Sequence, residues 1–198
     1  MRKNNGVILI AAGLLLILSA SAVLFYNQAQ NRKAGQLAQV RLEALQTAMA
    51  YNKGPALDPQ QPSTLSIQQN ALELDGERYI GYLAMPTLEL ELPVMSDWDY
   101  EKLKIAPCRQ FGSAKTDDLV IAAHNYKKHF ARLVDLKLGD EVLFYEVDGT
   151  VNRYDVVNIE TLNPTEVDKV KNSENALILY TCTYSGKART AVFCNRSG

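Results

Sequence analysis

The sequence predicts an all-β domain, a closed barrel of seven or eight mostly antiparallel strands with short helices, preceded by an N-terminal transmembrane helix. Three observations support this prediction. From residue 78 onward, short apolar runs alternate with turns that contain Gly, Pro or Asp, a pattern typical of strands that close into a barrel. Few stretches in this part are long enough for more than two helical turns. Residues 7–26 form an uncharged apolar run of the length that a helix needs to cross a bilayer.

The charges around this apolar run favour a membrane anchor with a short cytoplasmic N-terminus, residues 1–6. Arg2 and Lys3 precede the run, which favours a cytoplasmic N-terminus and places the rest of the chain outside the cell. A cleaved signal peptide is the alternative, because residues 20–22 (Ala-Ser-Ala) resemble a cleavage site. The run is long for a signal peptide and continues past that site, so we expect an uncleaved anchor over residues 7–26.

Residues 27–71 are expected to form a juxtamembrane helix followed by a linker. The helix is indicated by an apolar stripe of imperfect helical spacing: Leu37, Val40, Leu42, Leu45 and Met49. From residue 51 to 70 the composition changes to Pro, Gln, Gly and Ser, which is typical of a linker. The barrel is therefore expected over residues 72–198, and a chain that begins near Leu72 is expected to fold alone.

Within residues 72–198, apolar runs predict the order of the strands and turns. Residues 148–149, Asp-Gly, predict a tight hairpin because both residue types tolerate positive φ. Short helices are expected at 97–104 and 130–138, and at most one helical turn fits in 163–175. The predicted strands cover residues 78–85, 88–95, 119–123, 141–147, 150–159, 176–180 and 190–194.

Composition and motifs exclude several classes of function. The formal net charge of −1, with 22% charged residues, gives no basic excess for nucleic acid. Two His residues and no C-x-x-C pair do not make a zinc site, and serine-hydrolase, phosphate-loop and dinucleotide motifs are absent from the sequence. The number of Cys residues, three, is odd, so at least one thiol is unpaired; whether Cys108 and Cys194 pair stays open.

Three residues at predicted strand ends could carry nucleophilic chemistry. Cys182 ends one strand, and Arg189 begins the next one after a short turn, so the two should lie side by side. A thiol that faces a fixed cation favours the thiolate, the nucleophilic form. His124 ends the strand at 119–123, where it would be held firmly enough for general acid–base catalysis.

Other residues of the sequence could fill the same roles or support them. His129 follows two Lys residues in a polar segment, and we expect it to be a solvated surface residue. Arg196 falls beyond the predicted strand, whereas the guanidinium of Arg189 offers a rigid fork of donors for an oxyanion. Thr181 is expected to bind substrate or to position the site, and the backbone N–H of Cys182 would be a second oxyanion donor.

Residues 179–182, Leu-Tyr-Thr-Cys, followed by Arg189 and preceded far upstream by Ala123-His124, resemble the signature of the sortase family. The resemblance covers residues 79–196, with Ile178 where the family usually has Thr. It implies a sortase-like barrel and a cysteine transpeptidase of a Gram-positive type cell surface. Its substrates would be surface proteins with an LPXTG-like C-terminal sorting signal, and the acceptor an amine of a cell-wall precursor or a pilin.

The resemblance also implies roles for the site residues and needs no cofactor. Cys182 would attack the Thr-Gly bond and form a thioacyl-enzyme, His124 would move the protons, and Arg189 would stabilise the oxyanion. Some members bind calcium; here only Glu166 and Asp168 are nearby candidates, and a solvated loop explains them better. No metal is therefore expected.

The class within the family and the type of activity stay open at this stage. The segment after His124 resembles class B, whereas the short segment 163–175 is closer to classes A and D. Residues 58–59, Asp-Pro, match a lid dipeptide of some pilus-building members, but Gln60 follows and a linker explains them better. A cysteine peptidase that only hydrolyses and a non-enzymatic, membrane-tethered peptide-binding barrel are the alternatives.

Overall fold

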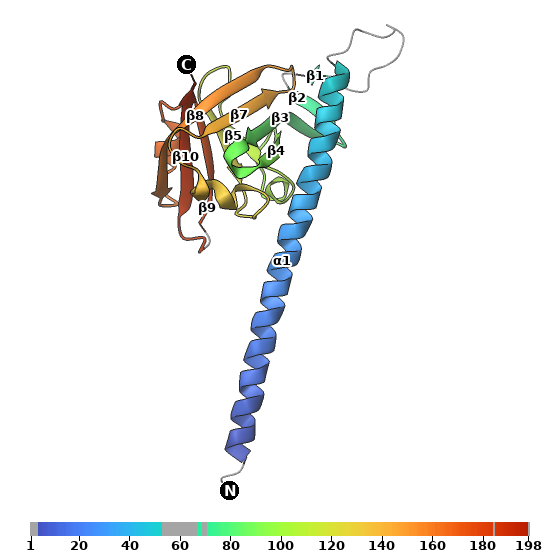
Figure 1. Ribbon diagram of the computed structural model, residues 1–198, viewed down its shortest axis with the longest axis vertical. Coiled ribbons are helices and arrows are strands. Elements are labelled where there is room, and N and C mark those ends of the chain that lie inside the picture. The colour runs from blue at the N-terminus through green and yellow to red at the C-terminus, as the bar shows by residue number, and fades with distance from the viewer. Residues whose placement is uncertain (1–3, 53–66, 69–70, 184, 198) are drawn as a thin grey trace. The chain divides into compact units, whose positions relative to one another are not determined.

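The computed structural model describes residues 4–52, 67–68, 71–183 and 185–197 (Figure 1). The Asp-Pro dipeptide at 58–59 and most of the predicted linker lie outside the described residues. The chain divides into two units, residues 1–33 and 34–198, and the long helix α1, Asn4–Asn52, runs through both. In the first unit, the segment predicted as an anchor is apolar and exposed. An 18-residue window of this helix has a mean hydropathy of 2.8, so α1 is long and apolar enough to span a membrane.

The second unit contains a closed β-barrel of eight strands, as the sequence predicts. Strand order around the barrel is β3-β4-β5-β6-β9-β10-β8-β7, and pairing of β7 with β3 closes it. All neighbours are antiparallel except β4–β5 and β6–β9, which are parallel. The bounds of the barrel strands are β3 Glu77–Met85, β4 Leu90–Met95, β5 Cys108–Phe111, β6 Leu119–Ala123, β7 Glu141–Glu146, β8 Val151–Leu162, β9 Leu177–Cys182 and β10 Arg189–Arg196.

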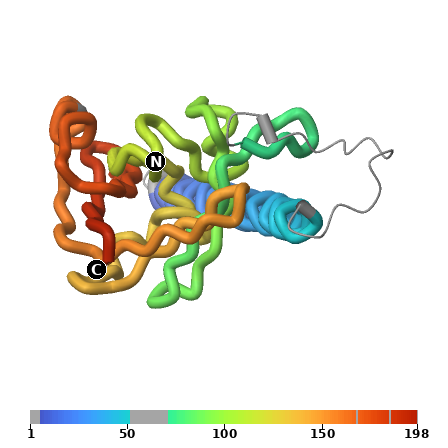
Figure 2. Tube along the Cα trace, turned by 90° about the horizontal axis from the view of Figure 1, so that it is seen from above, coloured from blue at the N-terminus to red at the C-terminus, as the bar shows by residue number. Residues whose placement is uncertain are grey.

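Two short strands and four short helices complete the described part of this unit. The strands β1, Ile67–Gln68, and β2, Ala71–Leu74, extend the sheet beside the first residues of β3. Figure 2 shows β9 and β10, in red, on the side of the barrel away from β2. The helices are the 3-10 helices η1 Pro86–Leu88, η2 Lys102–Lys104 and η3 Phe130–Asp135 and the α-helix α2 Val167–Lys171. The last three fall in the segments where the sequence predicts short helical turns.

The hairpin at residues 148–149 forms where the sequence predicts it, between β7 and β8. Gly149 has φ 89°, while Asp148 keeps a negative φ and caps the turn through its side chain, which accepts a hydrogen bond of 2.9 Å from the Thr150 amide. β8 and β10 are longer than the apolar runs that predicted them. They pair with each other over eight residues, and this backbone ladder carries both strands past the apolar stretches.

Alternation along the strands separates the interior of the barrel from its outer face. Leu177 and Leu179 belong to the interior cluster, together with Leu119 and Ile121 of β6. Ile178, between them, belongs to a second cluster on the outer face with Val120, Ala191 and Phe193. This alternation decides on which side the ends of β6, β9 and β10 present their side chains.

The C-terminal half of α1 packs on the barrel and supplies part of its hydrophobic core. The buried residues recur at intervals of three or four, which makes one stripe on the helix: Ala34, Ala38, Leu42, Leu45 and Met49. Leu45 and Met49 pack with Leu72 and Tyr79, while Val40, which the sequence places in the stripe, is 62% exposed. Arg41 forms an ion pair with Asp75. The expectation that a chain beginning near Leu72 folds alone therefore ignores a helix that covers part of the core.

Candidate active site

The strand register places Cys182 and Arg189 directly opposite each other. Cys182 is the last residue of β9, Arg189 is the first residue of β10, and the two pair across the antiparallel ladder. Side chains of directly paired residues lie on the same face of a sheet. The turn between them is fixed by a hydrogen bond of 2.9 Å from the Thr183 amide to the Ala188 carbonyl.

The parallel pairing of β6 with β9 brings His124 to the same end of the sheet. Ala123 pairs with Thr181, the last pair of this parallel ladder. The next residue after Ala123 is His124 and the next residue after Thr181 is Cys182, so these two continue the same register. Ala122, two residues before His124, pairs with Tyr180 and contributes to a cluster outside the barrel interior. Continuing the alternation places His124 on the face of the sheet that carries Cys182 and Arg189.

All three side chains are half-buried, which leaves them accessible to a ligand. Burial lowers the pKa of His124 below its ordinary value, and the positive charge of Lys104 lowers it further. Lys104, on η2, was not singled out in the sequence, because only the fold brings that turn beside His124. Within the described residues, Arg189 donates through Nη1 to the carbonyls of Gly186, at 3.3 Å, and Ala188, at 3.0 Å. These two bonds fix the orientation of its guanidinium.

Thr181 lies between these residues but on the interior face. Its side chain is 3% exposed, and its hydroxyl donates a hydrogen bond of 2.8 Å to the carbonyl of Ala123. This bond ties β9, which ends in Cys182, to β6, which ends next to His124. The Thr181 hydroxyl therefore joins the ends of these two strands, and both its role in positioning the site and its direct contact with substrate stay predictions.

The other two Cys residues differ from Cys182 in burial. Cys108 and Cys194 are both free and fully buried, and burial raises the pKa of each thiol to about 12. The structure therefore shows no disulfide between them. Since the thiolate is the reactive form, both are unreactive at neutral pH, and Cys182 is the accessible thiol.

The expectation that His129 is a solvated surface residue is wrong. Its side chain is 0% exposed, although Lys127 and Lys128 immediately before it are exposed. Burial lowers its pKa to about 4, and the backbone of Ala34 opposes this shift. The covering element is α1, more than 90 residues away in the sequence, which is why the local sequence did not indicate burial.

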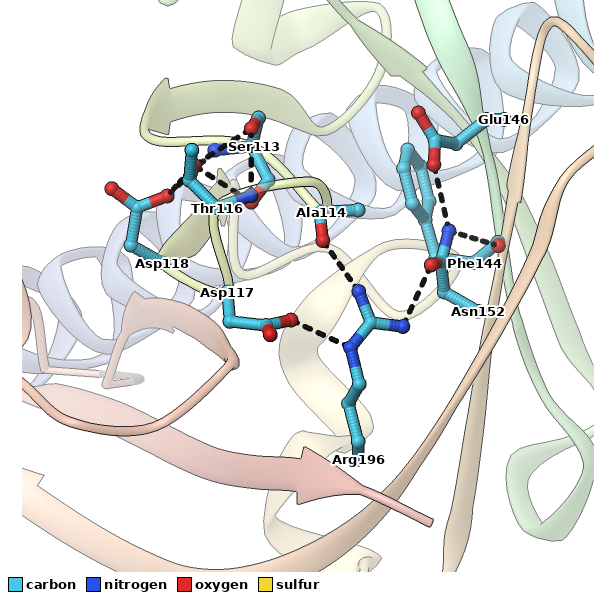
Figure 3. Close-up of polar contacts among 9 residues, drawn as sticks. All are labelled: Ser113, Ala114, Thr116, Asp117, Asp118, Phe144, Glu146, Asn152 and Arg196. Carbon is cyan, nitrogen blue, oxygen red and sulfur yellow. Dashed lines mark hydrogen bonds and ion pairs between the residues drawn. The ribbon is translucent and has the colours of Figure 1, made fainter. Parts of the chain in front are cut away.

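Arg196 lies at the other end of β10 and serves a structural purpose (Figure 3). It lies seven positions after Arg189, about 24 Å along an extended strand. Its Nε donates to Asp117 at 2.6 Å and its Nη1 to Asn152 at 2.9 Å. Asn152 in turn donates to the carboxylate of Glu146 at 2.9 Å. This network ties the end of β10 to the loop before β6.

No group of three metal-ligating side chains occurs in the part of the chain that the structure describes. Glu166, one of the two candidate calcium ligands, is engaged locally. Its carboxylate accepts a hydrogen bond of 2.7 Å from the Asn163 amide and forms an ion pair of 3.0 Å with Lys169. These contacts close the turn before α2.

Comparison with solved structures agrees with this fold. Three solved structures illustrate the similarity in fold: sortase A from Corynebacterium diphtheriae, sortase C1 from Streptococcus suis and a sortase D5 transpeptidase from Clostridium perfringens. The first has a TM-score of 0.55 and 21% identity, with 91% of this chain and 96% of that chain covered. The second has a TM-score of 0.53 and 23% identity, with 61% of this chain and 73% of that chain covered. The third has a TM-score of 0.53 and 18% identity, with 61% of this chain and 79% of that chain covered.

The similar structures fall into classes A, C and D, so they leave the class of this chain unresolved. No curated protein matches the sequence. The protein-family model of the sortase domain, in contrast, matches residues 83–197. This range is more than half of the chain and almost the whole barrel, and it includes the ends of β6, β9 and β10. On this match, the chain belongs to the sortase family.

Proposed function

We propose that this protein is a membrane-anchored cysteine transpeptidase in which Cys182 is the nucleophile, His124 the general acid and base, and Arg189 the stabiliser of the oxyanion. One observation carries the proposal: the register of β6, β9 and β10 gathers these three residues at one end and on one face of the sheet. Membership of the family supports a sortase-type transpeptidase in general.

In the first half-reaction, the thiolate of Cys182 attacks the carbonyl carbon of the Thr in an LPXTG-like sorting signal. A carbon–sulfur bond forms, and the carbonyl oxygen becomes an oxyanion. Collapse of this intermediate breaks the Thr-Gly carbon–nitrogen bond and leaves a thioacyl-enzyme. His124, in its protonated form, gives its proton to the departing amine of the Gly.

In the second half-reaction, an amine attacks the thioester carbonyl carbon. His124, now neutral, accepts the proton of this amine, and the carbon–sulfur bond breaks to release the thiolate of Cys182. The depressed pKa of His124 favours the neutral form that accepts the proton in this step, and it makes the less populated protonated form a stronger acid in the first half-reaction. The product is a surface protein joined by an amide bond to its acceptor.

Arg189 supports both half-reactions through geometry as well as charge. Its Nη1 is held by two carbonyls of the turn, which leaves the remaining N–H groups to donate to the oxyanion. A donor that is held in place before the reaction needs no reorganisation in the transition state. The backbone N–H of Cys182 would be a second donor. Thr181 keeps the ends of β6 and β9 in register.

We infer that the partners are surface proteins with a C-terminal sorting signal and an amine of a cell-wall precursor or a pilin. The apolar N-terminal part of α1 fits a membrane anchor. Since Arg2 and Lys3 precede it, the N-terminus would be cytoplasmic and the barrel extracellular. This orientation places Cys182 on the side of the membrane where such substrates are exposed.

Product analysis of the full chain in detergent tests this function. With an LPXTG peptide and a glycine-based amine, the expected product is the peptide joined to the amine, and with hydroxylamine it is the hydroxamate. Hydrolysed peptide alone, at every amine concentration, would indicate a cysteine peptidase instead. Peptide binding with no cleavage and no reaction of Cys182 with thiol reagents would indicate a binding protein.

A further inference from the structure

His129 is a fully buried imidazole close to the candidate active site, and the proposed chemistry does not use it. Its side chain is 0% exposed, and neither ring nitrogen has a hydrogen-bond partner among the residues that the structure describes. Burying a polar group without a partner costs free energy, so stability alone does not account for the ring at this position. Its neighbours are the residues that precede it in the same turn.

Three rings of this turn, those of His124, Tyr126 and His129, form a continuous row of tilted and edge contacts that ends at His124, and this row is called the stack below. The ring of His124 lies 5.0 Å from that of Tyr126, and the ring of Tyr126 lies 5.4 Å from that of His129 in an edge contact. The backbone is compact here as well, because the His129 amide donates to the Tyr126 carbonyl at 2.9 Å and the Phe130 amide to the His124 carbonyl at 3.3 Å. A displacement of His129 would therefore reach His124 through one intervening ring.

Helix α1 covers the far end of this stack. Ala34 and Ala38 are 3% and 2% exposed, and the carbonyl of Ala34 approaches the His129 ring without the geometry of a hydrogen bond. Gly35 lies against Lys128, and a Cβ at Gly35 would come within 2.9 Å of both the Cβ and the Cγ of that side chain. Because the Cβ of Lys128 is fixed to its backbone, the turn itself would have to move.

We propose that residues 34–38 of α1 clamp the stack of His124, Tyr126 and His129, so that His129 is a positioning residue for His124 and the docked part of the anchor helix belongs to the active site. This inference rests on the proposed function in one respect, the role of His124 as acid and base. The stack requires the shape of an aromatic ring at position 129, and the unpartnered nitrogens of His129 take no part in the reaction.

Two kinds of variant separate this positioning role from a general loss of structure. Gly35→Ala adds one methyl group between α1 and the turn, whereas Gly13→Ala adds the same group on the same helix with nothing within 4 Å. His129→Phe keeps a ring and removes both unpartnered nitrogens, whereas His129→Ala removes the ring. Thermal unfolding of each variant shows whether the barrel is intact.

The first readout is a titration that needs no substrate. The sequence contains two His residues, so the full chain with ¹³C-labelled His in detergent gives two imidazole signals. In the wild type and in Gly13→Ala, we expect pKa values of about 4 for His129 and below 6.5 for His124. In Gly35→Ala, water enters the stack, and both values should rise towards 6.5. An ordinary titration of His129 in the wild type would overturn the proposal.

The second readout is the split between kcat and KM for peptide cleavage. Gly35→Ala and His129→Ala should lower kcat by about 10- to 100-fold, the scale of a misplaced catalytic group, with KM changed less than about twofold. His129→Phe should stay within about threefold of the wild type.

Two further results would overturn the proposal. One is a His129→Phe chain as inactive as His129→Ala, which would assign chemistry to the imidazole. The other is a Gly35→Ala chain that matches Gly13→Ala in both readouts. A wild-type chain that binds but never cleaves the peptide would instead contradict the proposed function. In that case the titration still decides separately whether α1 clamps the stack.

Discussion

Replacing Leu45 by Ala tests whether the second half of α1 is part of the folded barrel unit. Leu45 is 0% exposed and packs in a cluster with Leu72 of β2, Tyr79 of β3 and Met95 of β4. Val40 lies on the same helix but is 62% exposed. Val40→Ala therefore removes apolar atoms from α1 without removing them from the core, which makes it the matched control.

The expected size of the effect follows from burial. Truncation of a buried Leu to Ala typically costs about 2–5 kcal/mol, and we expect about 3 kcal/mol for a side chain with no exposed surface. Both residues are helical and Ala is a better helix former than either, so propensity does not add to this cost. For a unit of this size, about 3 kcal/mol lowers the melting temperature by roughly 6–12 °C. Val40→Ala should change stability by less than about 0.5 kcal/mol.

Unfolding of the full chain in detergent provides the assay. The single Trp of the sequence, Trp98, lies between β4 and β5 and reports on the barrel by fluorescence. Melting of the wild type, Leu45→Ala and Val40→Ala should be compared at the same detergent concentration. Equal melting temperatures for the two variants would refute the packing of α1 on the barrel and would support the expectation that a chain beginning near Leu72 folds alone.

Three further outcomes are expected. A small alkylating reagent should modify Cys182 in the native chain, while Cys108 and Cys194 react only after denaturation; peptide mapping would show this, and early modification of Cys194 would contradict its burial. Arg189→Lys should lower kcat/KM by about 10²- to 10³-fold, since an ammonium cannot bond two turn carbonyls and the oxyanion in the same geometry; a near-normal rate would reduce the role of Arg189 to charge alone. His129 is neutral in the folded state down to about pH 4, whereas the unfolded chain protonates it below about pH 6.5. Its contribution to the free energy of unfolding is therefore complete above about pH 6.5 and is lost as the pH falls towards 4. Denaturant unfolding should therefore show a loss of about 2 kcal/mol between pH 7 and pH 5 that is reduced in His129→Phe, and an equal loss in both chains would contradict the assignment.

The barrel could be predicted because its determinants are local in the sequence. Apolar runs define seven of the eight barrel strands, and an Asp-Gly pair defines the turn between β7 and β8. The strand β5, Cys108–Phe111, was not predicted, because it has four residues and no clear apolar run. The positions of Cys182 and Arg189 on either side of a short turn are enough to predict that they pair, and the structure places them opposite each other. The prediction that His124 lies near Cys182 needed one more assumption, that the strand before His124 lies beside β9. That pairing, of β6 with β9, is present.

The burial of His129 could not be predicted because it depends on packing between distant segments. The segment around His129 contains two exposed Lys residues and is polar by composition, so nothing local indicates a buried ring. The covering residues on α1 are small, Ala34, Gly35 and Ala38, and small residues carry little weight in an apolar pattern. The stripe on α1 was partly misassigned for the same reason, since Val40 was counted and the two Ala residues were not.

The assignment of Cys182, His124 and Arg189 to one catalytic site is tested most directly by the intact mass of the chain during turnover. The wild-type chain is mixed with an LPXTG peptide without an acceptor amine, quenched in acid and weighed, and the modified residue is then located by peptide mapping. The expected result is an acyl adduct on Cys182 that disappears when an amine is added, with the amine-linked peptide as product. Cys182→Ala should form no adduct, and His124→Ala should form it at least about a hundredfold more slowly. An adduct on another residue, or normal product formation by Cys182→Ala, would contradict the account.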